Sequence, residues 1–299
     1  MIQLSFNVIV KTVAFILGKV IALVTIPLVS NALGIELYGK YNHLITIAGY
    51  GLVFINWGFL AKGIREIGSN NKNSIDVVHE IISTRVVLWL VSTIILVIIT
   101  IAVYQNIEAV VLILLALTAN LGQALNLDFY FYAKKNTIIP SIARLIGQIL
   151  FLILLLFFVE SSEDIYYLFF FLIIFQFSET VINYSFSKGM LSISSLSVNL
   201  KKSFYVIRSN FHLGFGAKTS FLTFSIPIPY FYSNEVLGAY MIAYKVFLLM
   251  TGIFSIGALV LSPFVVKYLQ EKNKKLIKIL SYSLLTFLIV GFIGGSVIF

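Results

Sequence analysis

Residues 86–104 read VVLWLVSTIILVIITIAVY and carry no charged side chain. A helix needs about 20 predominantly apolar residues to cross a lipid bilayer, and this stretch is long enough. Its apolar residues are continuous and do not alternate with polar ones, which favours a helix over a strand of a membrane barrel. Comparable apolar stretches recur along the chain. The sequence therefore predicts an all-α, polytopic transmembrane helical protein.

The composition supports this class of protein. Of the 299 residues, 60% are hydrophobic and 11% are charged, with a mean hydropathy of +1.01. These values exclude a soluble globular domain. The chain contains no cysteine, which excludes disulfides and thiolate metal sites, and its histidines and acids lack metal-ligand spacing. We expect no metal, no cofactor and no catalytic residues.

The charges between the predicted spans indicate the topology. Segments with several Lys or Arg residues, which include Lys62, Arg85 and Arg144, alternate with short segments that hold only acids, such as Glu160. Basic segments stay in the cytoplasm, so the amino terminus is predicted to be cytoplasmic. Topology thus accounts for the net charge of +9, and we expect no nucleic-acid partner. Arg85 is predicted at a solvated surface or gate. The predicted spans are 5–30, 38–61, 82–104, 108–131, 139–159, 165–187, 210–232, 238–266 and 276–299.

An internal repeat relates the two halves of the chain. Lys19 and Lys218 each lie near the middle of an apolar stretch, and 218 − 19 = 199. The same offset superimposes ELYGKY at 36–41 on EVLGAY at 235–240. We expect glycine in these motifs to permit a tight reversal and tyrosine to anchor the next span at the interface.

The repeat predicts two pseudo-symmetric helix bundles. The first bundle spans 1–187 and contains six helices. A serine-rich cytoplasmic linker follows at 188–209. The second bundle, 210–299, contains three predicted helices and is incomplete by comparison with the first. We therefore expect a chain truncated at its carboxyl terminus.

The two central lysines point to an anionic cargo. A lysine in the middle of a membrane costs roughly 2.5–3.5 kcal/mol, so two of them at equivalent positions suggest a transport pathway. Lys11 and Lys245 lie nearer to span ends and could assist. The alternatives are ion pairs or snorkelling, in which the apolar stem lets the ammonium reach the interface. Snorkelling suits Lys11 better than Lys19.

Short motifs along the chain resemble those of the O-antigen and capsular polysaccharide flippases, in the multidrug/oligosaccharidyl-lipid/polysaccharide exporter superfamily. The resemblance lies in LGIELYGKY (33–41), NWGF (56–59), GIREI (63–67), DFYFYAKKN (128–136) and LSPF (261–264). It implies two helix bundles around a central cavity in the bacterial inner membrane. It also implies translocation of undecaprenyl-diphosphate-linked oligosaccharides among membrane lipids, with other polysaccharide assembly proteins as further partners. Lys19, Lys218, Lys245 and Lys11 would then meet the diphosphate.

Two acids and three prolines have candidate roles in the transport cycle. Asp128 and Glu179 could take up H⁺ or Na⁺ and couple transport to an ion gradient, or could form salt bridges within the bundle. Pro27, Pro227 and Pro229 lie at corresponding levels of two spans and could act as hinges.

Two other functions remain open. A drug or cation antiporter of the same superfamily would need mainly acidic cavity residues, whereas the mid-span charges here are mostly basic. A polysaccharide polymerase or lipid-using glycosyltransferase would need a large outward loop or catalytic acids near the outer face. The predicted outward loops are short.

Overall fold

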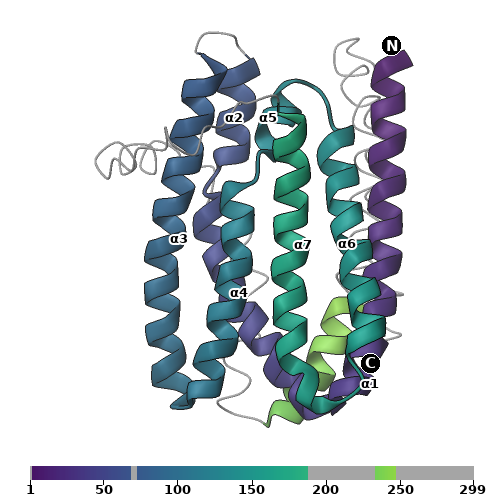
Figure 1. Ribbon diagram of the computed structural model, residues 1–299, viewed down its shortest axis with the longest axis vertical. Helices are drawn as coiled ribbons and strands as arrows, with labels where there is room; N and C mark the ends of the chain where they lie inside the picture. Colours follow the sequence, from purple (N-terminus) through teal and green to yellow (C-terminus); the bar gives the residue numbers. More distant parts are fainter. Residues whose placement is uncertain (1, 69–72, 188–232, 247–299) are drawn as a thin grey trace, which may run out of the picture. The chain divides into compact units, whose positions relative to one another are not determined.

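The computed structural model describes residues 2–68, 73–187 and 233–246, with side chains from residue 9 onwards. Within these ranges the regular elements are helices, several of them long and apolar enough to cross a membrane (Figure 1). The chain is an all-α, polytopic helical protein, as predicted.

Several predicted features fall elsewhere in the chain. The features that lie outside the described residues are Lys218, Pro227, Pro229, the linker at 188–209, and the spans at 210–232 and 276–299.

The first helix, α1 (Ile2–Asn56), comprises two arms that meet at Gly34, where φ is 74° and ψ is 163°. Side chains disfavour this positive φ, whereas glycine adopts it readily. The arms correspond to the predicted spans 5–30 and 38–61. Pro27 lies in helical backbone, so the non-helical dihedrals within α1 occur at Gly34 and not at the predicted hinge.

Gly39 does not form the reversal that the motif predicted, because it lies in the second arm of α1. It packs closely on the second copy of the motif. A Cβ on Gly39 would overlap Asn234 O and approach the backbone nitrogen of Gly238 to 2.9 Å, and a Cβ on Gly238 would overlap Ile35 O. Tyr41 is buried against Phe169 and is not an interface anchor. The glycines therefore have a packing role.

Two predicted spans are interrupted near the end where the basic residues gather. The span 38–61 breaks at Gly58, where φ is 75°, and continues as α2 (Phe59–Gly68). The span 108–131 divides at Asn126 into α4 (Ile107–Leu125) and α5 (Asp128–Ala133). Between these pairs lies α3 (Ser74–Tyr104), which Asn73 caps through a hydrogen bond to the backbone of Ile75.

The remaining described helices of this region form an antiparallel pair. They are α6 (Ile138–Phe158) and α7 (Ile165–Phe186), joined through the short 3₁₀ turn η1 (Ser162–Asp164). The helix α7 packs against α4 and α6, and α1 packs against α3, α4 and α6. These contacts hold α1, α6 and α7 close to one another.

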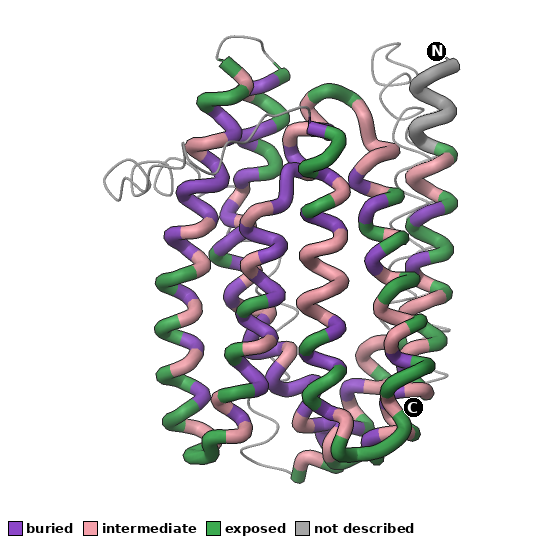
Figure 2. Tube along the Cα trace, in the orientation of Figure 1, coloured by how far each residue is buried: buried purple, intermediate pink, exposed green. Residues whose placement is uncertain are grey.

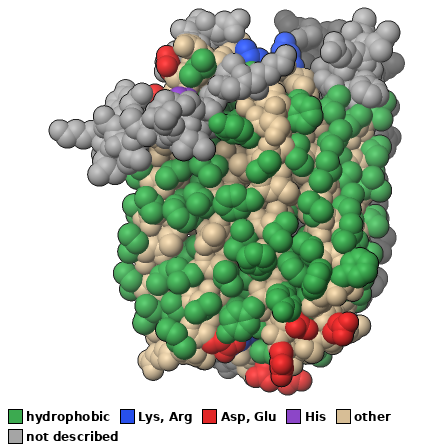
Figure 3. All heavy atoms as spheres, viewed as in Figure 1, with side chains coloured by type: hydrophobic (Ala, Val, Ile, Leu, Met, Phe, Trp, Pro, Cys, Tyr) green, Lys and Arg blue, Asp and Glu red, His purple; other side chains and the backbone are tan. Residues whose placement is uncertain are grey.

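The two ends of α6 carry opposite charges. Lys134 and Lys135 precede the helix, whereas Glu160, Glu163 and Asp164 follow it. Figure 3 shows most of the acidic side chains in view gathered at one end and Lys and Arg side chains at the other, where a few acids also lie, with apolar side chains covering much of the surface between the ends. We call these the acidic end and the basic end.

The burial pattern is that of a membrane protein. Figure 2 shows exposed and intermediate residues along the outer faces of the long helices and buried residues where the helices meet. Ile94 and Ile98 of α3 are 61% and 60% exposed, yet they lie within an uncharged stretch. Side chains of this kind suit contact with lipid tails.

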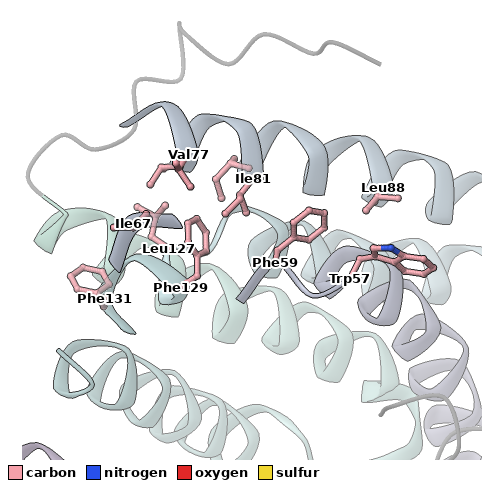
Figure 4. Close-up of a cluster of buried hydrophobic side chains, with 11 residues drawn as sticks. Trp57, Phe59, Ile67, Val77, Ile81, Leu88, Leu127, Phe129 and Phe131 are labelled. Atoms are coloured by element: carbon pink, nitrogen blue, oxygen red, sulfur yellow. The ribbon is translucent and has the colours of Figure 1, made fainter. Parts of the chain in front are cut away.

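A compact apolar cluster joins α2, α3 and α5 at the basic end. Phe59, Ile81, Ile82 and Phe129 are fully buried in it, and Trp57 lies at its edge (Figure 4). The cluster ties the two short helices, α2 and α5, to the long helix α3. It thereby fixes Asp128, the first residue of α5.

The chain divides into two compact units, residues 1–239 and 240–299. The described part of the second unit, residues 240–246, is helical and includes Lys245. The domain boundaries predicted from the repeat stay a prediction.

Candidate functional site

A pocket of about 350 Å³ opens between the first arm of α1 and helices α5, α6 and α7. It brings together four of the residues predicted from the sequence: Lys11, Lys19, Asp128 and Glu179. These residues come from α1, α5 and α7, which are distant in sequence. The pocket also contains Arg144 of α6, which falls within the predicted span 139–159 but was grouped with the basic residues of the cytoplasmic side.

One face of α1 supplies a wall of the pocket. Its lining residues recur at three- and four-residue spacing, from Lys11 through Gly18 and Lys19 to Ala22. This spacing places side chains on the same side of a helix. Gly18 faces α6, where a Cβ would overlap the flexible side-chain amide of Gln148.

Aromatic rings accompany the two lysines. The Lys11 Nζ lies 5.2 Å from the centre of the Tyr132 ring, and the Lys19 Nζ lies 5.3 Å from that of Phe15. A ring face attracts an ammonium without neutralising its charge. Within residues 9–68, 73–187 and 233–246, neither lysine forms an ion pair. Among these residues, therefore, no carboxylate competes with a ligand for either ammonium group.

Arg144 is the third cation of the pocket. Its Nε lies 3.6 Å from Oε2 of Glu179 on the neighbouring helix α7. The Arg144 side chain is 58% exposed, whereas that of Glu179 is 4% exposed. A polar pattern within the apolar span, Ser141, Arg144 and Gln148, could have revealed this position, since it recurs on one helix face.

Asp128 is the second acid of the pocket, and its partner lies outside it. The Arg85 Nη1 is 3.7 Å from Oδ1 of Asp128. The guanidinium of Arg85 also lies 5.9 Å from the ring centre of Phe59 and 5.1 Å from that of Phe129. Asp128 and Arg85 thus form one of the salt bridges that the sequence left open as alternatives to ion coupling.

The prediction of a solvated Arg85 was wrong, because the side chain is fully buried. The helix α3 begins at Ser74, well before the predicted start of its span, so Arg85 lies inside the bundle and not at its rim. Lys62 is likewise buried in α2, where it pairs with Glu80 and Glu66 instead of facing solvent in a loop.

Asn126 holds the break between α4 and α5 in place. Its backbone carbonyl accepts a hydrogen bond of 3.0 Å from Arg85 Nη1. Its side-chain Oδ1 accepts one of 2.7 Å from Asn183 Nδ2 of α7 and another from the Asp128 backbone N–H. The backbone carbonyl and the side-chain oxygen at the break therefore have partners on α3 and α7, and a buried carbonyl in a membrane helix requires such a partner.

The charges of the pocket sum to a net positive field. Three cations, Lys11, Lys19 and Arg144, face two carboxylates, Asp128 and Glu179. Both carboxylates have a guanidinium partner, so among the described residues Lys11 and Lys19 are the pocket charges without an ion-pair partner. Such a site suits an anion. Among the described residues there is no cluster of His, Cys, Asp or Glu that could hold a metal ion.

The position of the pocket along the bundle is defined by α6 and α7. Its α6 residues, Pro140 to Gln148, belong to the half of that helix that follows Lys134 and Lys135. Its α7 residues, Phe175 and Glu179, belong to the half of α7 farther from the acidic turn. The pocket therefore lies in the basic half of the bundle.

Comparison with known proteins identifies one family. A family model described as polysaccharide biosynthesis protein matches residues 4–269 of the chain. No curated protein matches the sequence, and no solved structure matches the fold.

Proposed function

We propose that this chain, which belongs to the family of polysaccharide biosynthesis proteins, translocates undecaprenyl-diphosphate-linked oligosaccharides across a bacterial inner membrane. It does so as a transporter and not as an enzyme. The observation that carries this proposal is the pocket in which Lys11 and Lys19 lie beside Arg144 and form no ion pair with any residue that the structure describes. A diphosphate is the part of such a cargo that these cations would hold.

The size of the pocket supports binding of the head group alone. Pockets for small molecules range over about 300–1,000 Å³, and this one, at about 350 Å³, is near the lower limit. The diphosphate enters, while the oligosaccharide extends beyond the pocket and the polyprenyl chain remains in lipid. Lysine suits this task because its ammonium is a mobile point charge that can hold a phosphate and then release it.

The charge asymmetry of the bundle supports the direction of loading. By the distribution of basic residues, the basic end faces the cytoplasm and the acidic end faces outward. The pocket lies in the basic half, so the cargo meets Lys11 and Lys19 as it enters from the cytoplasm. Lys245 and Lys218 are proposed to receive it later in the cycle.

The two acids of the pocket are each paired with an arginine. Asp128 and Glu179 each lie within 4 Å of a guanidinium group, at 3.7 Å and 3.6 Å. Uptake of H⁺ or Na⁺ by either carboxylate would first require that its guanidinium move away. Ion coupling is therefore a step that follows a rearrangement of these pairs.

A flipping assay with a matched control tests the proposal. The purified chain is reconstituted in vesicles with a fluorescent polyprenyl-diphosphate oligosaccharide, and a membrane-impermeant quencher reports which leaflet holds it. Lys19→Gln should slow transfer about tenfold or more, since a hydrogen bond to a charged group contributes ~1.5–3 kcal/mol. The control Lys40→Gln removes the same charge from a lysine that pairs with Glu108 outside the pocket, and should keep the rate.

Two results would contradict the proposal. One is transfer by the wild-type chain no faster than in empty vesicles. The other is a Lys19→Gln variant that transfers the lipid at the wild-type rate.

A further inference from the structure

The ion pair of Arg144 and Glu179 is loose. The distance of 3.6 Å between Nε and Oε2 exceeds that of a hydrogen bond, and Oε2 is a buried oxygen without a hydrogen-bond partner among the described residues. At this distance the pair is stabilised mainly by the attraction of opposite charges. A ligand that offers a better acceptor geometry can take the guanidinium from the carboxylate.

The two members of the pair differ in access. The Arg144 side chain is 58% exposed and lines the pocket, whereas Glu179 is nearly enclosed by the bundle. An incoming anion reaches the guanidinium while the carboxylate stays where the fold holds it. The other pocket carboxylate differs in this respect, because Arg85, the partner of Asp128, is fully buried and cannot be reached.

We propose that Glu179 is a built-in competitor for Arg144, which occupies the guanidinium in the empty pocket and yields it to the diphosphate. This inference rests on the proposed function and adds Arg144 to the cations that bind the head group. A guanidinium can donate two parallel hydrogen bonds to two phosphate oxygens. The Glu179 carboxylate, 3.6 Å from Nε, does not make this two-point contact with Arg144.

The competition has a consequence for selectivity. A weakly charged anion gains little from Arg144, because it must displace a carboxylate that is already present. A diphosphate carries more negative charge and gains contacts with Lys11 and Lys19 as well, so it can displace Glu179. The pair thus favours a diphosphate head group over inorganic phosphate, because Glu179 repels both anions and only the diphosphate gains enough from the cations to displace it.

A double-mutant cycle tests the competition. Inorganic pyrophosphate and inorganic phosphate are titrated by calorimetry into the full chain in lipid nanodiscs. Glu179→Gln keeps the shape of the side chain and frees Arg144, so pyrophosphate should bind on the order of tenfold more tightly. Inorganic phosphate should gain by a larger factor than pyrophosphate, so that the preference for pyrophosphate falls.

The gain should depend on Arg144. In an Arg144→Gln background the substitution Glu179→Gln should change affinity little, whereas in a Lys19→Gln background it should still tighten binding. Arg144→Gln alone leaves the Glu179 carboxylate buried without its guanidinium. If this variant fails to fold for that reason, the double variant Arg144→Gln/Glu179→Gln, which removes the carboxylate as well, serves in its place. That double variant should bind more weakly than Glu179→Gln.

Each outcome bears on a separate claim. Equal affinity of Glu179→Gln and the wild type, including the case in which both are too weak to measure, overturns the competition. A gain that persists without Arg144 also overturns it, because the effect would then be one of general charge. Lys19→Gln with wild-type affinity counts against the proposed function and leaves the pair of Arg144 and Glu179 to be judged by its own cycle.

Discussion

The Nη1 atom of Arg85 on α3 lies 3.7 Å from Oδ1 of Asp128, beside the break between α4 and α5, and the arginine is fully buried. The pair anchors the first residue of α5 to the middle helix α3. It therefore has a structural role, although Asp128 also lines the pocket.

Removal of the Asp128 charge should destabilise the protein. Asp128→Asn leaves the guanidinium of Arg85 buried without its counter-ion, which typically costs about 3–5 kcal/mol. The melting temperature in detergent, followed by circular dichroism, should fall clearly. The double variant Arg85→Gln/Asp128→Asn removes both charges and should recover part of the loss. An Asp128→Asn variant that melts with the wild type would show that the pair does not stabilise the fold.

The cluster of α2, α3 and α5 should contribute more to stability than the outer aromatic residues. Phe129 is fully buried, whereas Phe157 is 73% exposed. Phe129→Ala should cost about 3–5 kcal/mol, because it removes buried surface and leaves a cavity. Phe157→Ala is the matched control and should change the melting temperature little. Equal effects of the two substitutions would contradict the assignment of the core.

Two of the glycines of α1, Gly34 and Gly39, should respond differently to substitution. Gly39→Ala should lower the melting temperature because its Cβ would overlap Asn234 O, a backbone atom that cannot rotate away. Gly34→Ala meets no neighbour within 4 Å, so its cost is backbone strain at φ 74° and ψ 163°, about 1–3 kcal/mol. The substitution Gly39→Val should then be worse than Gly39→Ala, whereas a graded loss with side-chain size at Gly34 would contradict the open space there.

The pocket should be accessible to water. The chain has no cysteine, so single cysteines can be introduced without background. Lys19→Cys should react with a water-borne thiol reagent, and pyrophosphate should slow the reaction. Val20→Cys, at the adjacent residue and outside the pocket lining, should react more slowly because the thiol would face lipid. A Lys19→Cys variant that reacts from neither side of the membrane would refute the aqueous pocket.

Much of the fold could be predicted from hydropathy, because each span is a long apolar stretch. The arms of α1 and helices α3, α6 and α7 were recognised in this way. The break at Asn126 was not, since Arg85 of α3 satisfies its backbone carbonyl and Asn183 of α7 satisfies its side-chain oxygen. A partner that comes from elsewhere in the bundle leaves no local trace in the sequence.

The candidate site was predicted in part. Lys11, Lys19, Asp128 and Glu179 were identified as charges in apolar stretches, and the structure brings them to one pocket. Arg144 was missed because it lies close to a basic loop in sequence, and charge counting alone does not distinguish a loop residue from one on an inward helix face. Arg85 was misplaced for the same reason.

The first arm of α1 carries Lys11 and Lys19 on one unbroken helix. Because 19 − 11 = 8 and each residue rises ~1.5 Å, the two positions are spaced by about 12 Å along the helix axis. A head group that moved from Lys11 to Lys19 would cross more than a third of the ~30 Å hydrocarbon layer, and the helix would not need to bend.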